Sequence, residues 1–134
     1  MTEKFELYHC ETCGNIAEII INGNGDLMCC GEPMKLLTAQ TDSELKGEYH
    51  LPIKVLKNNT DEYIQVGLKQ HPMTEEHHIK FIQIISEDGQ TSILHFLETN
   101  DEPTMQLYKN NYGDYIAREF CNIHGLWANL ISHK

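Results

Sequence analysis

The chain has 134 residues, enough for one ordinary domain or for a small domain plus a compact module, and its formal net charge is −10. This acidic charge argues against nucleic-acid and anionic-membrane partners, which need a basic face, and no apolar run approaches the roughly 18 residues that span a bilayer. Because the first six residues also lack the apolar stretch of a signal peptide, we expect a soluble, cytoplasmic protein.

The first part of the chain predicts a small β-hairpin. Residues 16–21 suit a strand, the Asn-Gly-Asn-Gly run at 22–25 is strong turn chemistry, and Leu27 and Met28 lead the chain back. A core of fewer than about 40 residues rarely holds itself together, so this hairpin needs a staple.

Two cysteine pairs provide that staple. Cys10-x-x-Cys13 is followed after 15 residues by Cys29-Cys30, and a glycine comes directly after each pair. Four thiolates at this spacing suit a tetrahedral site for zinc or iron, and the motif alone does not distinguish the two metals. A purely structural zinc knuckle is the alternative, and the adjacent pair predicts a distorted tetrahedron.

Cysteines and histidines divide the chain into two regions. Residues 1–37 hold four of the five cysteines, whereas residues 48–134 hold the fifth and seven of the eight histidines. Residues 38–47 between them are polar and weakly patterned, so we predict a linker there. An odd number of cysteines without a secretion signal makes metal binding, rather than disulfide formation, the leading use of the thiols.

The second region predicts an all-β sandwich. Short apolar or alternating runs recur about every 11 to 14 residues with turn signals between them, and stripes of helical period are rare. The predicted strands contain Ile64, Val66 and Leu68 on one face, residues 79–85, residues 91–97 after a turn at 86–89, the alternating pair Met105 and Leu107, and the alternating set Ile116, Arg118 and Phe120.

Histidines and the fifth cysteine indicate a second metal site in this sandwich. Cys121 and His124 are separated by two residues, and His50, His71 and His77 supply further imidazoles. Four imidazoles and one thiolate make a five-coordinate site with one open position. Two rivals share some of these features: an iron protein that transfers electrons or binds metal without turnover, and a zinc-stapled sandwich that serves as an interaction module.

The order and spacing of these residues resemble those of the superoxide reductases of the two-iron desulfoferrodoxin type. The N-terminal region resembles the desulforedoxin module and the rest resembles the catalytic domain, over nearly the whole chain. The shared motifs are Cys10-x-x-Cys13-Gly14-Asn15, Cys29-Cys30-Gly31-x-Pro33-Met34, Glu48-x-His50-x-Pro52, His71-Pro72-Met73, His77 and Cys121-Asn122-x-His124-Gly125-Leu126-Trp127.

The resemblance implies an immunoglobulin-like β-sandwich after a small metal-stapled module, with two irons per chain, the first of which zinc can replace. It assigns the ligands and one further residue as follows: Cys10, Cys13, Cys29 and Cys30 around a rubredoxin-like iron; His50, His71, His77 and His124 around the catalytic iron, with Cys121 opposite the open position; and Glu48 as an occupant of that position in the oxidised resting state.

The resemblance also implies the reaction and its partners. Superoxide would be reduced to hydrogen peroxide in defence against oxidative stress, with electrons from a small rubredoxin-like protein, by a chain that forms homodimers. The backbone amides of Asn122 and Ile123 are expected to point at the Cys121 sulfur and tune its electron donation.

One position departs from the family pattern. The family usually has a lysine directly before the first ligand histidine, where it attracts superoxide, and this chain has Tyr49. With a net charge of −10 as well, long-range attraction of superoxide should be poor. Lys69, two residues before His71, is a candidate replacement, and a solvated lysine without a role is the alternative.

Overall fold

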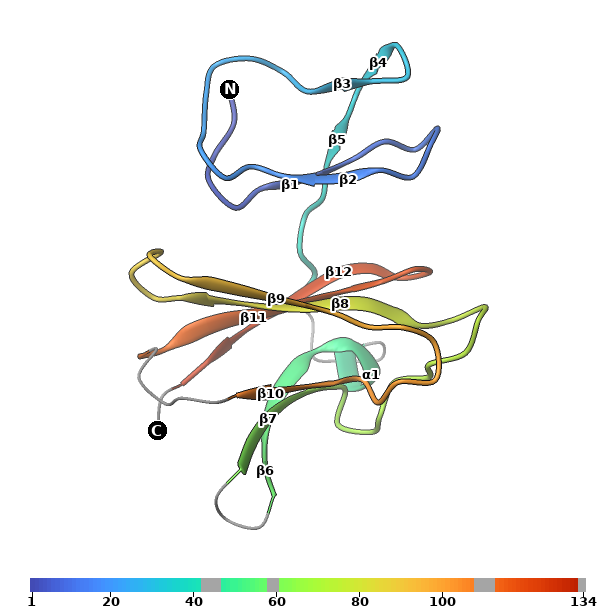
Figure 1. Cartoon of the computed structure of the whole chain (residues 1–134), viewed down its shortest axis with the longest axis vertical. Coiled ribbons are helices and arrows are strands. Elements are labelled where there is room, and N and C mark those ends of the chain that lie inside the picture. Colours follow the sequence, from blue (N-terminus) through green and yellow to red (C-terminus); the bar gives the residue numbers. More distant parts are fainter. Residues whose placement is uncertain (42–46, 58–60, 108–112, 133–134) are drawn as a thin grey trace. The chain divides into compact units, whose positions relative to one another are not determined.

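The computed structural model describes residues 1–41, 47–57, 61–107 and 113–132, and it divides into two compact units, Met1–Thr38 and Ala39–Lys134 (Figure 1). The predicted all-β class is confirmed, because the helical content of the described ranges is the single turn α1 (Gly47–His50). Nothing in those ranges forms a helix long and apolar enough to cross a bilayer.

Five very short strands make up the first unit. They form a three-stranded antiparallel sheet of order β2-β1-β5 and a separate two-stranded ladder of β3 with β4. Their bounds are β1 Leu7–His9, β2 Ile16–Glu18, β3 Met28–Cys29, β4 Glu32–Pro33 and β5 Lys35–Leu36.

The predicted partner of the strand at residues 16–21 is wrong. β2 pairs with β1 and not with the segment that follows the turn, and Ile20 and Ile21 lie beyond the strand with exposed side chains. The backbone N–H of Thr2 donates to the carbonyl of Gly23 at 2.9 Å, so the N-terminal segment runs along this stretch. That segment occupies the edge which the returning chain would need for a hairpin.

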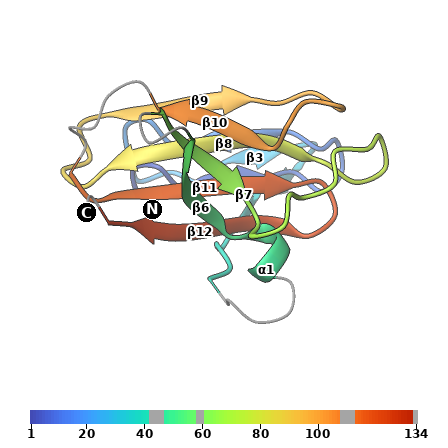
Figure 2. The same cartoon turned by 90° about the horizontal axis from the view of Figure 1, so that it is seen from below.

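Two antiparallel sheets make up the second unit (Figure 2). One has three strands in the order β10-β7-β6, and the other has four in the order β12-β11-β8-β9. Their bounds are β6 Pro52–Lys57, β7 Asp61–Val66, β8 Ile79–Ser86, β9 Ser92–Phe96, β10 Thr104–Leu107, β11 Tyr115–Cys121 and β12 Gly125–Ile131.

Alternating residues of the two sheets meet in one apolar core. Ile64 on β7 and Ile82 on β8 are fully buried, and Ala117 on β11 joins them in the same cluster. The period of two in these strands is the pattern that the sequence predicts for a sandwich. Leu68 is an exception, because β7 ends at Val66 and the Leu68 side chain is 69% exposed in the turn that follows.

Local irregularities place Cys121 at the end of β11. The register between β11 and β8 shifts between Phe120 and Cys121, so Cys121 pairs with Ile79. A three-residue turn then leads to Gly125, which pairs with Cys121 and has a φ of 84° that favours glycine. Bulges next to a site commonly re-aim a side chain, and this one, which skips Lys80 on β8, lies directly beside Cys121.

Gly67 fits a narrow space between two chain segments that carry predicted ligands. Its φ is 87°, and a Cβ at this position would lie 2.4 Å from the carbonyl oxygen of Lys69 and 2.6 Å from that of Tyr49. Both obstacles are backbone atoms, which do not move aside as a flexible side chain does. The absence of a Cβ therefore lets the end of α1 and the segment before His71 approach each other.

We predict that Gly67→Ala destabilises the second unit by at least about 2 kcal/mol, because it adds a backbone clash to an unfavourable φ. Urea unfolding and iron content would test this, with loss of iron expected at the second centre and retention at the first. Gly25→Ala is the control, since nothing lies within 4 Å of a Cβ there. Unchanged stability of Gly67→Ala would contradict the prediction.

Candidate metal centres

Four cysteines form the first centre. The ligand atoms of Cys10, Cys13, Cys29 and Cys30 all lie within 4.8 Å of one another, and the Cys13 and Cys29 sulfurs are 3.5 Å apart. Cys30 has a φ of 53°, which is rare for a residue with a side chain. This turn brings the sulfurs of two adjacent residues into one cluster.

Protonation of these thiols depends on their neighbours. The backbone N–H of Cys13 lowers the pKa of Cys10 to about 7, whereas the hydrogen bond with the Cys13 side chain raises the pKa of Cys29 to about 12. Four thiolates this close repel one another, so a cation is needed to ionise the whole set. A four-thiolate site for iron or zinc fits this arrangement.

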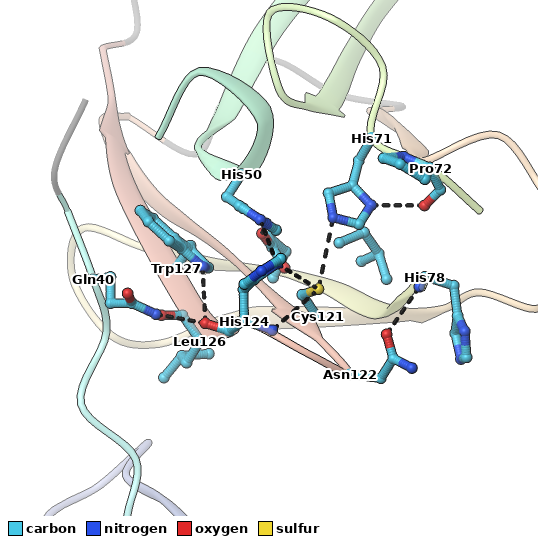
Figure 3. A network of polar contacts seen from close by, with 12 residues as sticks. Gln40, His50, His71, Pro72, His78, Cys121, Asn122, His124, Leu126 and Trp127 are labelled. Carbon is cyan, nitrogen blue, oxygen red and sulfur yellow. Dashed lines mark hydrogen bonds and ion pairs between the residues drawn. The ribbon is translucent and has the colours of Figure 1, made fainter. Parts of the chain in front are cut away.

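Four histidines and Cys121 form the second centre, and Figure 3 labels His50, His71, His124 and Cys121 of this set. The ligand atoms of His50, His71, His77 and Cys121 all lie within 4.8 Å of one another. His124 completes the set: its Nδ1 is 3.0 Å from Nε2 of His50 and 3.8 Å from the sulfur of Cys121. The structure thus brings together five residues from three distant segments.

These distances suit a single bound metal ion. Two nitrogens bound at right angles to an ion, each at about 2.1 Å, are about 3 Å apart, which is the separation of the His50 and His124 nitrogens. Nε2 of His77 is buried without a hydrogen-bond partner in the described chain. An orphaned buried nitrogen is costly, and a metal ion would satisfy it.

The surroundings of the histidines hold them neutral and oriented. Burial lowers the pKa of His71 to about 4 and also lowers the pKa of His77. Nδ1 of His71 donates to the Pro72 carbonyl at 2.6 Å, which leaves its Nε2 with a lone pair, 3.6 Å from the Cys121 sulfur. At neutral pH, these two rings can therefore ligate a metal without first losing a proton.

Cys121 is fully buried, and burial raises the pKa of its thiol. The backbone N–H of His124 donates to its sulfur at 3.4 Å, and the amide of Ile123 also favours the thiolate, as expected from the sequence. The expectation for Asn122 is wrong, because its amide donates instead to the carbonyl of His78 at 3.1 Å. The backbone amides of Ile123 and His124 thus favour the Cys121 thiolate, in place of the predicted amides of Asn122 and Ile123.

Glu119 lies behind the ligand set and has a fully buried side chain. Its Oε2 is 3.5 Å from Nδ1 of His50, and neither carboxylate oxygen has a hydrogen-bond partner in the described parts of the chain. Burial raises the pKa of this carboxyl well above its usual range. The carboxyl is placed to accept a hydrogen bond from Nδ1–H of His50 and so to keep Nε2 directed at the metal.

Gln40 and Trp127 contact two of the ligand residues, His124 and His50. The Gln40 side chain donates to the carbonyl of His124 at 2.7 Å, and the indole N–H of Trp127 donates to the same oxygen at 3.2 Å (Figure 3). The Trp127 ring also stacks on His50, with ring centroids 4.9 Å apart. Gln40 forms a parallel bridge with Trp127, so the segment before α1 contributes directly to this centre.

Asn122 connects the two loops that carry ligands. Its Oδ1 accepts from the backbone N–H of His78 at 2.9 Å, and its Nδ2 donates to the carbonyl of Glu76 at 3.0 Å. The side-chain amide of Asn122 accepts one hydrogen bond and donates another, and the two bonds together fix its orientation. It holds His77 and Cys121 at a constant separation.

The predicted ligands are therefore all found in the two clusters. Glu48 belongs to α1, but its side chain lies outside the described residues, so its role remains a prediction. Sequence reasoning missed Glu119 and Gln40. A carboxylate placed two residues before Cys121, on the same face of a buried strand, is the signal that pointed to Glu119.

These features define a two-centre metalloprotein: a four-thiolate module followed by a β-sandwich with a four-histidine, one-cysteine iron site. The family model for desulfoferrodoxin matches residues 42–130, and the model for the desulfoferrodoxin N-terminal domain matches residues 2–37. The desulfoferrodoxin of Syntrophotalea carbinolica is 41% identical over 129 residues, which cover 96% of this chain and 98% of that protein. The chain belongs to the desulfoferrodoxin family.

Two other relatives extend the comparison. The superoxide reductase of Pyrococcus abyssi is 35% identical over 101 residues, which cover 64% of this chain and 88% of that protein. The crystal structure of the superoxide reductase from Treponema pallidum superposes with a TM-score of 0.70 at 21% identity, over 96% of this chain and 99% of that one. The similarity to the Treponema pallidum structure shows a shared fold.

We predict that Glu119→Leu lowers metal affinity at the second centre by roughly 10- to 100-fold, because it removes the carboxyl that lies 3.5 Å from Nδ1 of His50 and is placed to orient this ring. Glu119→Gln retains a carbonyl acceptor and should fall between the wild type and Glu119→Leu. Competition for Co²⁺ or Fe²⁺ against a chelator would measure this, with the exposed Glu75→Leu as the control. Equal affinity of Glu119→Leu and the wild type would remove the positioning role.

Proposed function

We propose that this chain reduces superoxide to hydrogen peroxide at the second centre, with His50, His71, His77, His124 and Cys121 as the iron ligands. The observation that carries the proposal is the buried cluster of four imidazoles and one thiolate in a chain of the desulfoferrodoxin family. A superoxide reductase 35% identical to this chain, from Pyrococcus abyssi, supports the same activity.

The reaction balances with one electron and two protons for each superoxide. Bound ferrous iron would supply the electron, and an external donor would restore it. Burial lowers the pKa of His71 to about 4, so this ligand is neutral and does not offset the charge of the metal. With a single thiolate, the ferrous centre keeps a formal charge of +1, which favours a small anion at the open position.

The Cys121 thiolate would act on the metal from the protein interior. Amides at positions 123 and 124 favour the thiolate, while the apolar surroundings exclude water from it. A thiolate ligand pushes electron density toward iron, and hydrogen bonds to the sulfur moderate this effect. Glu119, with its carboxyl 3.5 Å from Nδ1 of His50, and Trp127, which stacks on the His50 ring, would hold His50 in place.

The first centre and the partners form the second part of the proposal. Cys13 and Cys30 are exposed, so a small rubredoxin-like donor has access to the first iron. We infer a homodimer from the family resemblance, and a cytoplasmic location because none of the five cysteines forms a disulfide, which suits a reducing compartment. Glu48 is proposed as the residue that occupies the open position in the oxidised state.

We predict that Cys121→Ser lowers the second-order rate constant for superoxide by roughly 100-fold or more and removes the thiolate-to-iron band of the second centre, because the one thiolate of the ligand set is lost. Pulse radiolysis of the ferrous protein and its visible spectrum would measure both. Cys13→Ser is the matched control: it should lose the first iron and keep the superoxide rate. A normal rate in iron-loaded Cys121→Ser would refute the proposed site.

Lys69 is proposed to replace the cation that Tyr49 does not supply. The backbone carbonyls of Lys69 and Tyr49 both lie beside Gly67, and this closeness of the two backbone segments supports the proposal. Lys69→Ala should slow the superoxide reaction about two- to fivefold at low ionic strength, and added salt should shrink the difference. The exposed Lys80→Ala is the control, and an equal rate for Lys69→Ala would exclude the role.

A further inference from the structure

The two centres differ in how far solvent reaches their sulfur atoms. Cys121 at the second centre is fully buried, whereas Cys13 and Cys30 at the first centre are exposed and Cys29 is half-buried. Cys10 is the one cysteine of the first centre that is buried. Because oxidation of a cysteine requires access to its sulfur, a small oxidant dissolved in water reaches the first centre and not the Cys121 thiol.

Two of the accessible sulfur atoms also lie close to each other. Cys13 is in the turn between β1 and β2, and Cys29 is the last residue of β3 (Figure 1). Their sulfur atoms are 3.5 Å apart. A tetrahedral ion with metal–sulfur bonds of about 2.3 Å holds its sulfur ligands about 3.8 Å apart, so the two atoms are neighbours whether or not a metal is bound.

Other pairings at this centre are less favourable. The sulfur atoms of Cys29 and Cys30 are 3.9 Å apart, but these residues are adjacent in the chain. Adjacent Cα atoms are about 3.8 Å apart, which is closer than the roughly 4.4 Å that an unstrained disulfide needs. Cys10 is only 4% exposed and is therefore shielded from an oxidant in solution. Cys13 and Cys29 are thus the pair in which access and a short sulfur–sulfur distance coincide.

We propose that Cys13 and Cys29 are an oxidative modification site, at which hydrogen peroxide forms a disulfide and releases the metal of the first centre. The Cys13 sulfur attacks one oxygen of the peroxide, the O–O bond breaks, and a sulfenic acid forms as hydroxide leaves. The Cys29 sulfur then displaces a second hydroxide and forms the S–S bond. Two thiolates lose two electrons in total, and one peroxide gains them to become two hydroxide ions.

This modification acts on one centre only. After it, Cys10 and Cys30 are the remaining thiols of the first centre, and two thiolates hold iron or zinc far more weakly than four. The second centre keeps its ligand set, because Cys121 is fully buried. The proposed function forms hydrogen peroxide as its product, and the inference rests on that function only for the source of the oxidant. Peroxide that accumulates would therefore remove the first metal and leave the second centre loaded.

The experiment treats the iron-loaded full chain with a small molar excess of hydrogen peroxide, then unfolds it, alkylates the remaining thiols and maps the cysteines by mass spectrometry. The expected result is a crosslink between the Cys13 and Cys29 peptides, loss of two of the five alkylated cysteines and release of the iron of the first centre. Cys121 is the internal control and should be alkylated in full. Added peroxide requires no turnover, so this result is separate from the superoxide rate that tests the proposed function.

Cys29→Ser and Cys30→Ser are matched variants, since each removes one ligand of the first centre by the same change of side chain. Cys30→Ser keeps the proposed pair and should still form the disulfide between Cys13 and Cys29. Cys29→Ser leaves Cys13 without its neighbour, so Cys13 should instead be oxidised to sulfinic or sulfonic acid. A wild type that forms no crosslink overturns the proposal, and so does a crosslink between any other pair of cysteines.

Discussion

A thiol buried among imidazoles is the constraint on which the second unit depends. Cys121 is inaccessible to water, and His50 and His71 are each only 2% exposed. Polar groups at this depth are unfavourable unless each one finds a partner, and the nearest partners here are one another. A bound cation resolves this conflict for the whole set at once, which is why residues from three distant segments converge on a single point.

The two units use metal in opposite ways. In the first unit the strands have only two or three residues, and few side chains besides Leu7 and Cys10 are buried among its described residues. Metal binding there supplies stability that the core cannot. The second unit has a continuous apolar core between its sheets, and this core surrounds the ligands. In that unit the packing shapes the centre, so its stability does not rest on the metal alone.

Sequence reasoning reached the ligands and the sandwich but not the residues that support them. The spacing of cysteines and histidines and the alternation of apolar residues along the strands are local signals. Both can be found in the sequence without knowledge of the fold. The pairing of β2 with β1 and the bracing role of Gln40 depend on contacts between segments far apart in the chain. Gln40 lies in a polar stretch that predicts a linker, and Glu119 reads as an ordinary polar residue of a strand. The spacing of two places Glu119 on the same face of β11 as Cys121, but only the fold shows that its carboxyl lies 3.5 Å from Nδ1 of His50.

The acidic net charge opposes the approach of an anionic substrate, and the distance dependence of electrostatics explains how the two are compatible. At about 0.1 M salt, charges further than roughly 10 Å from an approaching ion are largely screened. The outer carboxylates therefore act mainly on encounter, while the ligand set acts on binding. Because burial keeps His71 neutral, the positive charge of the metal remains exposed to the substrate at short range.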